Sequence, residues 1–217
     1  MVDVMTRTLF AIALVAMAAG NTTAQDPTKT IPDSYKVAFE NDYVRVVRVH
    51  YPAGAKLPEH THAAGTTVYV YLNDSDGVIF RHVGGSNSSV TRPAVKSGGM
   101  RVATGREEHH TAENTSKTAS DFLRIFFKTD DAGGPRNLRQ RLSPDDRTFE
   151  NKQMRITRLR LEQHDSVSID AKEPALLIEL PSGDHRWIDA SKSTTLENHD
   201  ARDLHVIRID FLTRPGN

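Results

Sequence analysis

The stretch from Gly54 to His62 reads Gly-Ala-Lys-Leu-Pro-Glu-His-Thr-His, with five residues between the glycine and a His-x-His pair. Two histidines at positions i and i+2 of an extended chain project from the same face. Their imidazoles can bind one cation, because histidine ligands hold zinc and similar transition metals at about 2.0–2.1 Å. The stretch therefore predicts a strand that carries two metal ligands, His60 and His62, and a third ligand on another strand.

Short predicted strands flank this stretch on both sides. Runs of β-branched and aromatic residues with partial alternation occupy residues 44–51, 67–72, 78–83 and 122–127. Turn-forming residues separate these runs, notably at 52–54 and 73–77. No segment of useful length has the periodicity of a helix. Many short strands at close spacing predict an all-β sandwich or barrel.

The candidate third ligand is His110, which lies just before a predicted strand. With it, the chain resembles the cupin superfamily over residues 36–128. The opening of this region is also similar to the start of small exported cupins of unassigned function. The positions that match the two cupin motifs are Gly54, His60 and His62 for the first, and Gly99, His110 and Asn114 for the second.

The resemblance implies a jelly-roll barrel, or double-stranded β-helix, with a metal site made by His60, His62 and His110. The glutamate of the first motif would fall at position 66 or 67, and both positions hold threonine. Three neutral histidines imply a divalent iron, nickel, copper, zinc or manganese ion. The alternative is a vestigial site, in a chain that kept the fold and lost the metal. We expect Thr66, Thr67 and Asn114 to line the site, with Asn114 holding a turn.

Two sequence patterns recur in the second half of the chain. Residues 44–49 are echoed by 154–159, and residues 110–114 are echoed by 194–198. Internal duplication explains two patterns that recur in the same order. The alternative is two unrelated sets of strands. Because the two offsets differ by about 26 residues, we expect the second copy to lack roughly one β-hairpin.

Residues 153–217 are therefore expected to form a shortened, degenerate cupin-like half. Asp170, Lys172 and Thr194 stand there in place of the three histidines, so this half should hold no metal. Residues 129–152 are polar and rich in turn formers. They predict a linker, with a short helix near 138–142.

The charge balance and the amino-acid usage exclude several functions. The 217 residues include 28 Lys plus Arg and 28 Asp plus Glu, so no net charge favours nucleic acid or an anionic membrane. The chain has no cysteine, which excludes disulfides, thiolate ligands and a cysteine nucleophile. The expected partner is a small molecule. The second expected partner is another copy of the chain in a homodimer, because exposed sheet edges invite pairing.

Three functions remain open at this stage. The first is a metal-dependent enzyme of dioxygenase, isomerase or lyase type, acting on a small polar molecule. The second is a non-catalytic protein that binds a small ligand, and the third is a structural module. The fold alone does not decide between them.

The first residues have the pattern of a secretory signal. Arg7 precedes an apolar run at residues 9–19, which is shorter than the roughly 20 residues that span a membrane. Small residues before Gln25 offer a cleavage site. We expect a signal peptide at 1–24, an N-terminal arm at 25–35 and a periplasmic or secreted protein with no membrane contact after cleavage. The alternative is an uncleaved N-terminal anchor.

This interpretation predicts the mass of the mature chain. Protein recovered from the periplasm or the medium should begin at Gln25 or at a neighbouring residue, as measured by intact-mass spectrometry. Full-length protein that stays in the cytosol would contradict it.

Overall fold

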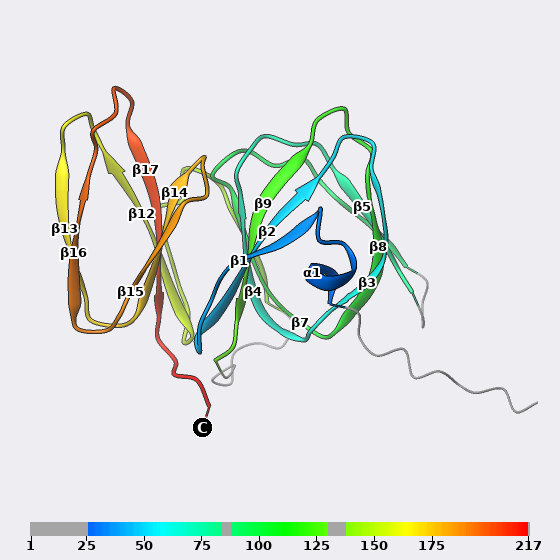
Figure 1. Cartoon of the computed structure of the whole chain (residues 1–217), viewed down its shortest axis with the longest axis horizontal. Helices are drawn as coiled ribbons and strands as arrows, with labels where there is room; N and C mark the ends of the chain where they lie inside the picture. Colours follow the sequence, from blue (N-terminus) through cyan, green and yellow to red (C-terminus); the bar gives the residue numbers. More distant parts are fainter. Residues whose placement is uncertain (1–25, 84–87, 130–137, 217) are drawn as a thin grey trace, which may run out of the picture.

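The computed structural model describes residues 26–83, 88–129 and 138–216, and the predicted signal peptide lies outside them. The chain forms two β-sheet halves that lie side by side (Figure 1). The one helix among the described residues, α1 (Pro27–Thr30), is a single turn within the N-terminal arm. No helix of the described residues is long and apolar enough to cross a membrane. The all-β prediction is confirmed.

The first half consists of two antiparallel sheets that enclose a barrel. The larger sheet contains, in order, β1 (Tyr35–Glu40), β2 (Val44–Tyr51), β9 (Ser120–Phe127), β4 (Gly65–Tyr71), β7 (Met100–Gly105) and β10 (Arg139–Leu142). The smaller sheet contains β3 (Lys56–His62), β8 (Glu108–Asn114), β5 (Val78–His82) and β6 (Ser89–Arg92). Alternate residues of both sheets point inward, where Tyr35, Tyr51 and Phe122 pack with Phe80.

The second half repeats this arrangement with fewer strands. One sheet contains β11 (Thr148–Glu150), β12 (Met154–Leu161), β17 (Leu204–Phe211), β14 (Ala175–Leu180) and β15 (His185–Ile188). The other contains only β13 (Ser166–Ala171) and β16 (Lys192–Glu197). The β5–β6 hairpin of the first half has no counterpart in the described part of the second. The predicted loss of one hairpin from a duplicated unit is therefore confirmed.

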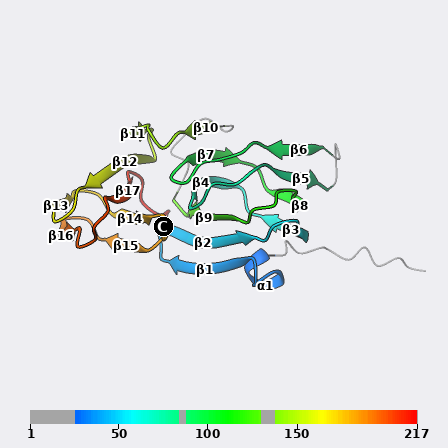
Figure 2. The same ribbon diagram turned by 90° about the horizontal axis from the view of Figure 1, so that it is seen from above.

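The largest apolar core lies between the two halves. It is built from the outer face of the larger sheet, with Val46 and Val68 among its members, and from the facing sheet of the second half, with Ile156, Ile178 and Ile209. Figure 2 shows these sheets next to each other when the molecule is seen from above. The second half thus packs on the outside of the first barrel and does not complete its interior.

The predicted linker contributes a strand to each half. Residues 138–142 were expected to form a short helix, and this prediction is wrong, because Arg139–Leu142 is strand β10. It pairs antiparallel with β7, from Arg139 opposite Ala103 to Leu142 opposite Met100. Leu142 is buried in the core between the halves, so an edge strand satisfies both the backbone and the apolar side chain. Strand β11 pairs with β12 in the second half.

The shared core predicts that the two halves unfold together. Phe211 is 1% exposed, and its ring lies 4.7 Å from that of Phe127 and 5.2 Å from that of Trp187, between ring centroids. Phe211→Ala should lower the free energy of unfolding by about 3–5 kcal/mol, as for other buried aromatic residues. Val37→Ala is the control, because Val37 is 45% exposed. Denaturant unfolding followed by circular dichroism measures both. Two separate transitions, of which only one shifts, would contradict a shared core.

Candidate metal centre

A β-bulge in strand β3 sets which residues of the histidine stretch face the barrel interior. The pairing of β3 with β8 shifts between Leu57, opposite Ala112, and His60, opposite His110. Three residue steps on β3 therefore face two on β8, so Leu57 and His60 lie on the same face despite their odd spacing. Pro58 lies within the bulge, where a residue without an N–H leaves no ladder bond unmade. His62 follows His60 by two residues and points the same way.

The three predicted histidines meet inside the barrel. The ring centroids of His60 and His62 are 4.9 Å apart, those of His60 and His110 are 4.8 Å apart, and those of His62 and His110 are 5.2 Å apart. One ring nitrogen from each lies within 4.8 Å of the others. An ion bound at about 2 Å would require the nitrogens to draw closer together.

Burial keeps these imidazoles neutral. His60 is 0% exposed, His62 7% and His110 1%. Desolvation lowers the pKa of His60, lowers that of His62 well below its ordinary value, and lowers that of His110 to about 2. The neighbouring Arg124 guanidinium acts in the same direction on all three. A neutral imidazole has a free lone pair, which is the form that binds a metal.

The hydrogen bonds of His60 define its tautomer. Its Nδ1 lies 2.8 Å from the carbonyl oxygen of Pro58, which only accepts, so Nδ1 carries the proton. Its Nε2 is then an acceptor and receives the hydroxyl of Tyr35 at 2.9 Å. The Tyr51 hydroxyl lies 2.5 Å from that of Tyr35 and donates to it. The Nε2 lone pair of His60 therefore points into the cluster. It can coordinate a metal ion if the hydrogen bond from Tyr35 breaks.

His110 differs, because both of its ring nitrogens are buried and have no hydrogen-bond partner in the described structure. The nearest carboxylate oxygen, on Glu108, lies 3.9 Å from Nδ1, which is beyond hydrogen-bond distance. Buried nitrogens without a partner are rare in folded proteins and call for an explanation. A metal ion at the cluster would supply one. The donor set of three neutral imidazoles fits a divalent transition metal.

Comparison with solved structures places the fold. AerE from Microcystis aeruginosa aligns over 82% of this chain and 97% of its own, with a TM-score of 0.56 and 12% identity. The bacterial pirin YhhW from Escherichia coli, solved in complex with nickel(II), aligns over 84% of this chain and 91% of its own (TM-score 0.55, 15% identity). Vicilin from tomato aligns over 78% and 75% of the two chains (TM-score 0.54, 12% identity). The chain has a bicupin fold. No family model and no curated protein matches the sequence.

The threonines of the first cupin half occupy opposite faces of β4. Tyr69 and Tyr71 line the cavity, whereas Val68 and Val70 pack in the core between the halves. By strand alternation Thr67 shares the cavity side and Thr66 the other. The Thr66 hydroxyl bonds to that of Thr104 at 3.0 Å. Of the two positions expected to line the site, only Thr67 therefore lies on the inner face.

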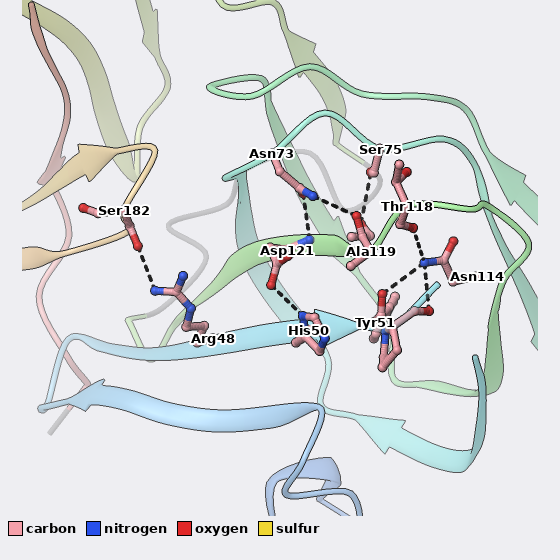
Figure 3. A network of polar contacts seen from close by, with 12 residues as sticks. Arg48, His50, Tyr51, Asn73, Ser75, Asn114, Thr118, Ala119, Asp121 and Ser182 are labelled. Atoms are coloured by element: carbon pink, nitrogen blue, oxygen red, sulfur yellow. Dashed lines mark hydrogen bonds and ion pairs between the residues drawn. The ribbon is translucent and has the colours of Figure 1, made fainter. Parts of the chain in front are cut away.

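Asn114 holds a turn of the cupin barrel. Its amide nitrogen donates to the carbonyl oxygens of Tyr51 (3.0 Å), Pro52 (3.1 Å) and Thr118 (2.9 Å), as Figure 3 shows in part. Its Oδ1 accepts the backbone N–H of Ser116 at 3.1 Å. Asn114 is 1% exposed and is not among the residues that line the cavity. Its part in the site is to fix the end of β8.

The same arrangement recurs in the second cupin half around Asn198. Its amide nitrogen donates to the carbonyl oxygens of Leu161, Glu162 and Arg202, and its Oδ1 accepts the N–H of Asp200. Every partner is the duplicate of a partner of Asn114. The duplication thus extends to individual hydrogen bonds.

The other histidines near the cluster have different roles. His109 points outward, and its Nε2 contacts the carboxylate of Glu59. His82 on β5 stands directly opposite His110, and their ring centroids are 5.5 Å apart. Glu113 on β8 forms ion pairs with Arg81 and Lys56 and does not line the cavity.

Sequence reasoning did not find the remaining residues of the cavity. Tyr35 and Tyr51 lie against His60, and the cavity is also lined by Arg92, Arg101 and Arg124. The only signal for them was a charged residue inside an apolar strand, as with Arg124 in the run Phe122–Phe127. An arginine on the inner face of a strand is unfavourable unless a polar group or a ligand interacts with it there.

The Asn114 network predicts matched losses of stability in both halves. Asn114→Ala leaves buried carbonyls and an N–H without partners and should lower the free energy of unfolding by about 3 kcal/mol. Asn198→Ala should cost a similar amount because its bonds are the same. Chemical denaturation of both variants tests this, and a loss well under 1 kcal/mol in either one would contradict it.

Proposed function

We propose that the first cupin half binds a divalent transition metal through His60, His62 and His110 and acts on a small polar molecule there. The observation that carries the proposal is His110, whose two ring nitrogens are buried without a partner next to two other neutral imidazoles. The nickel(II) complex of the pirin YhhW, which shares the fold, supports a metal in a cupin of this architecture. The ion would be iron, nickel, copper, zinc or manganese.

Each histidine has a defined part in holding the ion. His60 offers Nε2, since Nδ1 is fixed on Pro58. His62 and His110 offer one nitrogen each from neighbouring strands. When bound, such an ion supplies a Lewis acid with open positions for water or substrate. Tyr35 and Tyr51 form a hydroxyl pair beside these positions, and burial raises the pKa of both, so they stay protonated donors.

The reaction class that fits is that of a dioxygenase, an isomerase or a lyase. A second candidate is a non-catalytic cupin that binds a small ligand with a vestigial metal site. One observation favours it: the Tyr35 hydroxyl occupies the His60 lone pair in a closed hydrogen-bond chain. In that case Tyr35 stabilises His60 and the cavity binds its ligand without an ion. For either function, we propose from the N-terminal segment that the site acts in the periplasm or outside the cell.

The metal proposal is tested by two histidine variants. His62→Ala should lower metal affinity by about a hundredfold or more, because even loss of an outer-shell partner costs about 10–100-fold. His109→Ala is the matched control, since it adjoins His110 and points outward to Glu59. Metal content after dialysis, measured by mass spectrometry, and circular dichroism for the fold give the result. Wild-type protein that takes up no metal after reconstitution would overturn the proposal in favour of the second candidate.

A further inference from the structure

Three arginines converge on the cavity beside the histidines. Arg101 on β7 and Arg124 on β9 stand on either side of Tyr69 in one row across the larger sheet. Arg92 reaches the same cavity from β6, in the opposite sheet. Its guanidinium carbon lies 5.8 Å from the Tyr69 ring centroid, and that of Arg101 lies 4.0 Å from it. The three side chains therefore enter one space from two walls of the barrel.

None of these arginines has a carboxylate partner in the described structure. Other arginines of the chain do, including Arg45 with Asp26 and Arg155 with Glu150. The Nε atoms of Arg101 and Arg124 are buried and make no hydrogen bond. The aromatic rings of Tyr69 and Phe80 cover Arg101 and Arg92 but accept no hydrogen bond from them.

Two carboxylates also line the cavity, Asp76 and Glu108, and neither forms an ion pair with the three arginines. Asp76 accepts a hydrogen bond from the Ser116 hydroxyl at 2.8 Å. Glu108 lies near His110 and forms no ion pair with an arginine. The three arginines are half-buried, so each guanidinium has lost part of its hydration without gaining an ion pair from the described residues, which is unfavourable.

The second cupin half provides an internal comparison. Arg208 is the duplicate of Arg124, and its guanidinium lies 2.7 Å from the Asp210 carboxylate, two residues further along the strand. In the first half Phe126 occupies the place of that aspartate. Where the site has degenerated, the arginine is neutralised within its own strand, and where the histidines are present, the arginine is left without a partner.

The electrostatics of the cavity agree with this geometry. Burial alone would raise the pKa of Tyr69, yet Arg101, Arg124 and Arg92 together lower it below its ordinary value. Burial, with the charge of Arg101 as the next cause, lowers the pKa of Arg92. The Glu108 carboxylate acts in the opposite direction on both groups, so it offsets part of the positive potential that the three arginines create in the cavity.

We propose that the barrel cavity binds a small organic carboxylate, whose carboxylate group is held by Arg92, Arg101 and Arg124 next to the three histidines. Guanidinium groups bind carboxylates in a bidentate geometry, with two parallel N–H···O bonds. The identification of this anion as the substrate rests on the proposed metal-dependent function. Binding of the anion itself depends only on the arginines.

The size and surroundings of the cavity limit the ligand. The space beside the histidines is about 40 Å³, which is room for about three water-sized groups and therefore for one carboxylate group. A wider hollow of about 280 Å³ shares Arg92 and Arg101 and adds Arg141, together with Lys96, which is paired with Asp74. A short mono- or dicarboxylate therefore fits, and the basic hollow gives it a route of entry.

The two bound groups should also support each other. Three neutral imidazoles leave the ion with its full positive charge, and the arginines repel that charge. A carboxylate in the cavity offsets the repulsion, so each ligand should raise the affinity for the other by the same factor.

The test measures binding of malonate to the metal-free full chain by isothermal titration calorimetry. Malonamide, which has the same skeleton without charge, is the ligand control. We expect malonate to bind at least tenfold more tightly than malonamide. Arg124→Gln and Arg101→Gln should each weaken malonate at least tenfold. Arg81→Gln, on the outer face where Arg81 pairs with Glu113, should leave it unchanged.

Equal affinities for malonate and malonamide would overturn the inference without any variant. Unchanged malonate affinity in both Arg124→Gln and Arg101→Gln, with the fold verified by circular dichroism, would overturn it too. Metal uptake by the same preparations separates this inference from the proposed function. Uptake of metal without malonate binding refutes the carboxylate site alone. Malonate binding without metal uptake supports the carboxylate site and refutes the metal-dependent function.

Discussion

The register between β3 and β8 is the constraint on which the site depends. His60 stands opposite His110 only because the bulge at Pro58 shifts the pairing by one residue. A one-residue slip would move every side chain of β3 to the other face. The histidines would then point outward. Without the bulge, Leu57 and His60 could not both face the interior, because they are three residues apart. The bulge is thus the local irregularity that lets one short strand serve both packing and chemistry.

The sequence predicted the parts of the site that local spacing determines. His60 and His62 follow from a two-residue period, and His110 and Asn114 from the spacing of the second motif. Tyr35 and Arg92 could not be found in this way, because they belong to neither motif and the cavity that they enter is lined by strands that lie far apart in the chain. The prediction of a helix at residues 138–142 was wrong because local composition does not show which strand edge is free. Their polar composition resembles a linker, and only the free edge of β7 makes them a strand.

The duplication separates the structural from the chemical residues of a cupin half. Asn114 and Asn198 keep identical hydrogen bonds, so the second half retains the turn that closes the barrel. The histidines and the β5–β6 hairpin are missing from it. Arg208 remains but is paired with Asp210, which removes its charge from the interior. In the first half the histidines and the hairpin are present, and the arginines of the cavity have no carboxylate partner among the described residues.

The core between the halves has a consequence for mutational tolerance. Ile156, Ile178 and Ile209 on the facing sheet must remain apolar and well packed, because they cover the outer wall of a barrel that is not their own. The far sheet of β13 and β16 covers only the interior of its own half, with Ile169 and Leu196. Random mutagenesis should therefore accumulate neutral changes on that distal side first.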